Sequence, residues 1–385
     1  MKTTFAMAAM ALGLALPGMA PAGPGLDDPE LLAWMHSANA AQRSRLEALA
    51  LREDARSLLM AMQLVHPMFP LREDPEQEIA QEKARASALF ERAVQAESGD
   101  PVAAWMLATC SADSGLAACG SPASRERLAA DAGSYAAAHL WLAQVAEATG
   151  DEAAFEAHFQ AAAEAPIFSL EQDIGELIWS AWETVDFPEA DAEIAQAYAR
   201  QVEIDPGAFV EQIVALSVTA RVAAFALPAY RFPYSACGLS SAAEPVPTQR
   251  RSQCLSIFTT MAENRPNLLQ SIIATGAMVR MSHKGREAEV WKERVRTAWW
   301  VREMGLPLVV ALSTRHDQDF FETWRRNGEF QAWLELMDRN GVDIAPPDGW
   351  LPEDEAARAL IEGDDAASRQ PDGVPGGSVE GSQPE

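Results

Sequence analysis

Apolar residues recur at helical spacing along most of this chain, in segments separated by short breaks rich in Pro, Gly or charge. The predicted helices cover residues 30–38, 41–65, 75–95, 170–182, 188–202, 205–227, 266–281, 285–304, 317–327 and 329–340, together with helix pairs within 98–167. No segment alternates apolar and polar residues as a half-buried strand would. The pattern predicts an all-α protein.

The segment 98–167 carries the clearest internal pattern. Residues 104–108 (AWMLA) align with residues 139–143 (HLWLA), an offset of 35 positions. A period of this size indicates stacked pairs of helices. Asp100-Pro101 provides an N-cap followed by a proline at the first helical position, and Gly150-Asp151 separates two helices.

Small and large apolar residues in this segment are placed to pack the helix pairs. Ala143 and Ala162 allow two helices to approach closely, and Phe159 fills the groove between pairs. The predicted packing positions are Trp105, Leu107, Ala108, Leu142, Ala143, Gly150, Phe159 and Ala162.

These positions resemble a degenerate tetratricopeptide or Sel1-like repeat. The matching residues are Leu142, Ala143, Gly150, Phe159 and Ala162, with Pro166 one place short of the family's terminal proline and residues 130–133 similar to the end of a Sel1-like unit. His139 and Phe155 depart from the family pattern, and the resemblance covers residues 98–167 only. It implies antiparallel helix pairs stacked as a right-handed α-solenoid that presents a binding surface. An Ala-rich helical hairpin without repeat ancestry is the alternative.

The N-terminus has the pattern of a secretory signal peptide. Lys2 precedes an apolar run from Phe5 to Leu16, and small residues follow Pro17. We expect cleavage near Ala20 or Ala22, which gives a signal peptide of up to 22 residues, and a periplasmic or secreted protein in the style of a Gram-negative bacterium. No other segment is apolar for long enough to predict a membrane span.

Four cysteines fit an oxidising compartment. Pairing of sequence neighbours predicts disulfides Cys110–Cys119 and Cys237–Cys254, each worth about 3 kcal/mol on loop-entropy grounds. No Cys-x-x-Cys spacing occurs and no histidine lies close to a cysteine. The sequence therefore predicts neither a metal site nor a cofactor.

The formal net charge is −26, from 30 basic and 56 acidic residues. Such a chain repels the phosphates of nucleic acids, so we expect no nucleic-acid partner. A local basic concentration at 284–302 is interleaved with glutamates, which favours ion pairs along a solvated helix face over a partner-binding patch.

The predicted organisation has five parts. They are the signal peptide (1–22), an N-terminal helical repeat-like region (23–227), a Pro-rich loop pinned by a disulfide (228–255), a C-terminal helical region (256–362) and a disordered tail (363–385). Tyr230, Phe232 and Tyr234 in the Pro-rich segment indicate either packing on a helix or an exposed binding surface.

Motifs with local spacing rules for nucleophiles, phosphates or metals are missing from the sequence. Residues 314–319 (TRHDQD) could supply acid–base or metal chemistry, but Asp317 and Asp319 better suit a helix N-terminus. His139 and His158 lie on neighbouring helices of one unit and could meet. No residue is predicted to be catalytic.

The sequence thus favours an exported helical protein that binds a protein, a peptide or a cell-envelope component. The alternatives are an envelope hydrolase or lyase with dispersed acids around a groove, and a purely structural periplasmic protein. Two carboxylates with raised pKa values in a groove would favour the enzyme. Exposed aromatic residues in a groove would indicate contact with a peptide or a glycan.

Overall fold

The chain is helical throughout the part that its computed structural model describes. The described residues are 29–69, 71, 75–96, 99–110, 120–196, 209–224, 230–239, 246–264, 267–282, 285–312 and 317–363. Among them, the sole β-type pairing is one bridge between Tyr135 and Ile167. The all-α prediction is confirmed. The predicted signal peptide, and the predicted tail beyond Gly363, lie outside the described residues.

The first helices are α2 (Pro29–Ala50), α3 (Ala55–Gln63) and α4 (Pro75–Gln95). The predicted break at 39–40 is wrong, because α2 continues to Ala50 and the break follows it. The Asn39 amide does not compete with its own helix, since it donates to the Phe69 carbonyl at 2.7 Å and accepts from the Phe69 N–H at 3.2 Å. A tertiary contact therefore keeps this polar residue helical.

The repeat-like segment forms α5 (Pro101–Thr109), α6 (Pro122–Asp131), α7 (Ala136–Thr149) and α8 (Glu152–Glu164). The Asp100 side chain begins α5 by accepting from the N–H groups of Val102 and Ala103 at 2.9 and 3.0 Å. Gly150 ends α7 with φ 73°, a left-handed conformation that glycine adopts without strain. The two aligned blocks thus lie in α5 and α7.

Helix α7 separates two apolar cores. Leu142 packs in one of them with Leu107 and Ala108, whereas Ala143 packs in the other with Phe159 and Ala162. The second core is shared with residues 232–291. Every predicted packing residue except the capping Gly150 is buried, with at most 4% exposure for Trp105, Leu107, Ala108, Leu142, Ala143, Phe159 and Ala162. Alternating helix faces therefore join the two halves of the chain.

The repeat-like segment is followed by α9 (Glu171–Glu183) and, further along the chain, by α11 (Phe209–Ala224). The predicted helix at 170–182 is confirmed. Of the helix predicted at 188–202, residues 188–191 are not helical, residues 192–196 are helical, and residues 197–202 lie outside the described part of the chain. Trp34 donates its indole N–H to the Pro188 carbonyl at 3.1 Å, which anchors this irregular connection to α2.

The segment predicted as a loop at 228–255 contains helix α12 (Arg231–Ala236) and the first half of α13 (Thr248–Glu263). Its two described prolines are compatible with helices because Pro233 lies in the first turn of α12 and Pro247 precedes α13. Cys237 and Cys254 form the predicted disulfide, with their Cα atoms 5.8 Å apart. Cys110 is also disulfide-bonded, but its predicted partner, Cys119, lies outside the described residues.

The C-terminal helices are α14 (Leu268–Met281), α15 (Arg286–Ala311), α16 (Gln318–Asn327), α17 (Glu329–Arg339) and α18 (Glu355–Glu362). Helix α15 runs past its predicted end at Met304 and contains Pro307. Gly305 lies directly against the Trp333 ring, whose nearest carbon is 2.7 Å from where a Cβ at position 305 would be. The close packing of α15 on α17 therefore requires a glycine at this position.

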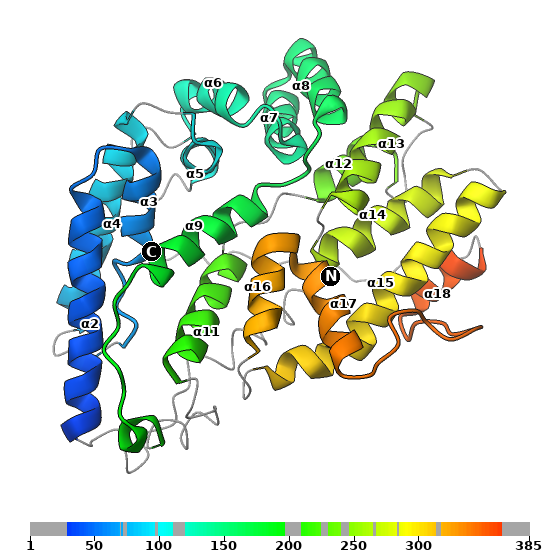
Figure 1. Cartoon of the computed structure of the whole chain (residues 1–385). Helices are drawn as coiled ribbons and strands as arrows, with labels where there is room; N and C mark the ends of the chain where they lie inside the picture. The colour runs from blue at the N-terminus through cyan, green and yellow to red at the C-terminus, as the bar shows by residue number, and fades with distance from the viewer. Residues whose placement is uncertain are drawn as a thin grey trace, which may run out of the picture.

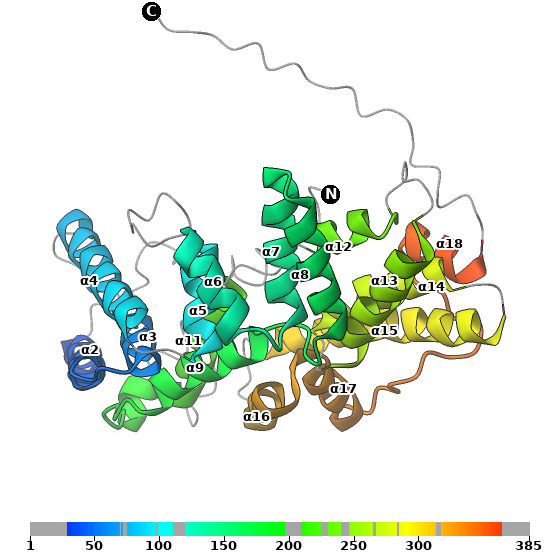
Figure 2. The same cartoon turned by 90° about the horizontal axis from the view of Figure 1, so that it is seen from above.

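The helices form an extended array with α9 crossing its middle. Figures 1 and 2 show α2–α4 at one end and α13–α15 with α18 at the other, joined by α5–α8. The first turn of α9 lies near the centre of the molecule, close to α16 and α17 (Figure 1). This crossing brings together segments that are far apart in the sequence.

Candidate functional site

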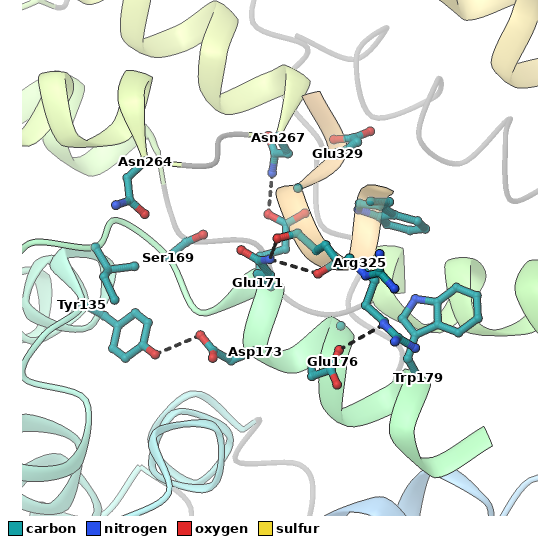
Figure 3. A pocket seen from close by; sticks show the side chains of 16 residues that line it. Tyr135, Ser169, Glu171, Asp173, Glu176, Trp179, Asn264, Asn267, Arg325 and Glu329 are labelled. Atoms are coloured by element: carbon teal, nitrogen blue, oxygen red, sulfur yellow. Dashed lines mark hydrogen bonds and ion pairs between the residues drawn. The ribbon is translucent and has the colours of Figure 1, made fainter. Parts of the chain in front are cut away.

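A cavity of about 650 Å³ opens at the start of α9, between that helix, the turn before α14 and the junction of α16 with α17 (Figure 3). We call it the α9 cleft. It is lined by Tyr135, Ile167, Ser169, Glu171, Gln172, Asp173, Gly175, Glu176, Trp179, Asn264, Asn267, Trp324, Arg325, Arg326, Gly328 and Glu329.

Three helices begin at this cleft: α9 at Glu171, α14 at Leu268 and α17 at Glu329. Asn267 begins α14 through a reciprocal capping box with Gln270. Gly328 has φ 91° and is both the end of α16 and the start of α17, so only a glycine makes this tight connection without strain. Partial positive charge at the three N-termini favours carboxylates there.

The first carboxylate is Glu171, the first residue of α9. It accepts hydrogen bonds from the side-chain amides of Asn267 and Gln270, the latter at 3.4 Å, and both bonds end on Oε2. Burial, followed by repulsion from Glu329, raises the pKa of Glu171 to about 7, although the Asn267 hydrogen bond opposes the shift. Glu171 is therefore poised to exchange a proton near neutral pH.

The second carboxylate is Glu329, the first residue of α17. Its Oε2 accepts the backbone N–H of Leu268 at 3.1 Å. Burial raises the pKa of Glu329, and hydrogen bonds from Leu268 and the Trp333 side chain partly offset that effect. Both carboxylates thus bind the first turn of α14, one through the Asn267 side chain and one through the backbone.

Two further carboxylates in the cleft already have partners. Asp173 accepts from the Tyr135 hydroxyl at 2.9 Å, and burial followed by this contact raises the Tyr135 pKa. Arg325 pairs with Glu176, 3.6 Å from its Nε, and with Glu183 outside the cleft. Asp173 is therefore tied to Tyr135, and Glu176 is paired with the Arg325 cation.

Aromatic rings complete the walls. Trp179 and Trp324 are half-buried, and both line the cleft from opposite helices, α9 and α16. Gln172 ties these helices together by donating to the carbonyls of Arg325 and Arg326 at 3.0 and 2.9 Å. The arrangement offers flat apolar surfaces next to hydrogen-bonding groups.

The residues singled out in the sequence lie elsewhere. The repeat-packing residues form the cores, and the disulfide braces α12 against α13. Phe232 is buried, and Tyr230 and Tyr234 pack on the same core, which supports packing over an exposed binding surface.

The basic helix face is also accounted for locally. Lys292, Arg294 and Arg296 pair with Glu289, Glu263 and Glu293 at 3.1, 2.9 and 2.7 Å. Arg302 lies over the Trp299 ring at 4.6 Å. Residue 284 of this face lies outside the described residues, so the contacts above concern residues 286–302 only.

Asp317, from the acid-rich motif, is a structural cap. It accepts from the Phe320 N–H at 2.8 Å and pairs with Arg339 at 2.9 Å. Asp319 is exposed in the first turn of α16, at a helix N-terminus as predicted, whereas residues 314–316, including His316, lie outside the described residues. His139 and His158 do meet, with stacked rings 5.8 Å apart, and the His139 Nε2 bonds the Gly133 carbonyl at 3.1 Å.

No motif marked Glu171 or Glu329, because the helices that carry them meet only in the folded chain. Asn267 lies 96 residues from Glu171 in the sequence. Within the described residues, no three His, Cys, Asp or Glu side chains gather as metal ligands. None of the described helices has the length and the apolar run that a membrane span requires. Comparison of the chain with protein-family models, with curated proteins and with solved structures finds no match.

Proposed function

We propose that this chain is an exported helical scaffold that binds a ligand in the α9 cleft. The observation that carries the proposal is the cavity itself: about 650 Å³, within the range of small-ligand sites, with aromatic walls and polar groups from four separate segments. The ligand is a small polar molecule or the exposed end of a peptide or glycan. Binding is thus assigned to a defined cleft instead of to an extended concave surface.

Export is part of this proposal. The signal-like N-terminus predicts a periplasmic or secreted protein, and the Cys237–Cys254 disulfide fits an oxidising compartment. We also propose that α5–α8 descend from tetratricopeptide or Sel1-like repeats and stack as a solenoid. The support for this is that both aligned Leu-Ala pairs, at 107–108 and 142–143, are buried.

The test is a thermal-shift screen of the mature chain, residues 23–385, against sugars, amino acids, short peptides and amines. A compound that binds in the cleft should lose binding in Asn264→Trp, because Asn264 lines the cleft and a bulky ring there obstructs it. Asn340→Trp is a matched control: Asn340 is also a helix C-cap, at the end of α17, but does not line the cleft. Binding that survives Asn264→Trp, or a screen without any ligand, would contradict the proposal.

A second candidate function is a hydrolase or lyase acting on the cleft's ligand. The observation that favours it is the pair Glu171 and Glu329, whose pKa values are both raised within one cleft, a frequent property of acid–base residues. Each ligand from the screen would be assayed for cleavage by the wild type and by Glu171→Gln. Turnover that Glu171→Gln abolishes without loss of binding supports catalysis; binding without turnover supports the scaffold alone.

A further inference from the structure

We infer that the ligand of the α9 cleft carries an ammonium group, which Glu171 and Glu329 bind together against the aromatic walls. This inference rests on the proposed function and names the ligand's chemical class. It follows from the charges, the free acceptor atoms and the wall residues of the cleft.

The charge balance of the cleft is incomplete. Among the described residues, no Lys, Arg or His forms an ion pair with Glu171 or Glu329. The lining cations are engaged elsewhere, Arg325 with Glu176 and Glu183 and Arg326 with Glu322. Carboxylates removed from water without a cation are unfavourable, so a cationic ligand would gain from entering and an anionic one would be repelled.

Acceptor atoms remain for such a ligand. The hydrogen bonds from Asn267 and Gln270 both reach Oε2 of Glu171, which leaves Oε1 to accept from a ligand. An ammonium group has three donors and no acceptor, which suits two carboxylates. Charge-assisted bonds of this kind are the strong ones.

The walls favour an organic cation over an inorganic one. Trp179, Trp324 and Tyr135 present aromatic rings to the same cavity, and ring faces attract ammonium groups. Calcium, by contrast, takes six to eight oxygen ligands, whereas the described residues gather no group of three His, Cys, Asp or Glu side chains that could hold a metal ion. An alkylammonium or amino-sugar group meets both features of the cleft.

Proton release distinguishes this mode of binding from others. With its pKa at about 7, Glu171 is about half protonated at neutral pH in the free protein. A nearby ammonium favours the carboxylate, so binding should expel up to about half a proton per site at pH 7. A neutral ligand that accepts a hydrogen bond from the protonated Glu171 would not release that proton.

The experiment compares ligands in which ammonium groups replace hydroxyl groups: one in glucosamine relative to glucose, and two in 1,4-diaminobutane relative to 1,4-butanediol. Isothermal titrations of the mature chain at pH 7, in two buffers of different ionisation enthalpy, report both affinity and proton release. We expect the amine of at least one pair to bind at least tenfold more tightly and to release protons. Glu171→Gln and Glu329→Gln should each reduce that preference about tenfold, whereas Glu147→Gln, an exposed carboxylate on α7, should not.

Each outcome decides between the two claims. One outcome is that ligands bind, lose binding in Asn264→Trp, and show no preference for the amine. That result would overturn the ammonium inference and leave the proposed function standing. Amine preference that survives both glutamine variants would place the amine elsewhere and also overturn the inference. If no compound binds at all, both claims fail. Melting curves confirm that the variants fold, and proton release by the wild type tests the inference independently of them.

Discussion

The α7–α8 pair and the α9 cleft are built on opposite principles. The pair is made from residues close in sequence, and its interface is apolar: Ala143, Phe159 and Ala162 are fully buried. The cleft is made from residues far apart in sequence, and its centre holds two carboxylates with raised pKa values. The pair contributes stability, whereas the cleft uses some of it to hold polar groups away from water, as binding sites commonly do.

The largest effect should come from the apolar side of this comparison. Phe159→Ala leaves a cavity between α8 and the core around Cys254, and should lower the free energy of unfolding by about 3–5 kcal/mol. Chemical denaturation measures it. Phe155→Ala, at a half-buried neighbour on the same helix, should cost clearly less; equal losses would show that Phe159 is not a core residue.

The second-largest effect on stability should come from removing the Cys237–Cys254 disulfide. Replacing Cys237 and Cys254 together by serine opens a loop of 17 residues and should lower the free energy of unfolding by about 3 kcal/mol. Reduction of the wild type should have a similar effect on this region. No change in the denaturation midpoint would mean that packing of Phe232 and Tyr230 alone holds α12.

A substitution in the cleft should raise the free energy of unfolding, whereas the two changes above lower it. Glu171 has a pKa of about 7 when folded and near 4.5 when unfolded, so the folded chain holds an extra proton between these values. Stability from this group therefore falls as pH rises from 4.5 to 7. Above pH 7, Glu171→Gln should raise the free energy of unfolding by on the order of 1–3 kcal/mol.

Denaturation of wild type and Glu171→Gln at pH 5 and pH 8 measures that difference. The gain should be present at pH 8 and be absent or reversed at pH 5. Glu147→Gln serves as the control and should show no such pH dependence. Parallel stability curves for wild type and Glu171→Gln would contradict a raised pKa and weaken the contrast with the α7–α8 pair.

The smallest effect concerns the two histidines that meet in the α7–α8 pair. Burial lowers the pKa values of His139 and His158, so protonation opposes the fold and stability falls as pH drops below about 6.5. His139→Gln should reduce that loss by up to about 1 kcal/mol between pH 7 and pH 5. An unchanged pH profile would show that the stacked rings do not sense protonation.

Sequence patterns predicted the helices α5–α8 well because their signals are local. Capping by Asp100, the break at Gly150-Asp151 and the burial of Leu142 and Phe159 follow from spacing that neighbouring residues share. The same reasoning misplaced the break at 39–40 and the end of α15. A contact with Phe69, which lies 30 residues from Asn39 along the chain, decided the first of these positions.

The α9 cleft shows even more clearly which features local sequence patterns predict and which depend on tertiary contacts. Glu171 and Glu329 each read as ordinary acidic residues in the first turn of a helix, where carboxylates are common. Their raised pKa values arise because α9 and α17 begin against the first turn of α14, which removes water and brings like charges together. No local spacing encodes that meeting.

The amino-acid sequence by itself determined the helical class, most helix boundaries, the local disulfide pairing of Cys237 with Cys254 and the apolar faces of α7 and α8. These depend on periodicity, capping and short loops, which act within a few turns of chain. Tertiary structure alone decided which helix ends meet, and with them the α9 cleft. The pKa of a carboxylate depends on every group within several ångströms, and these groups come together only when the helices pack.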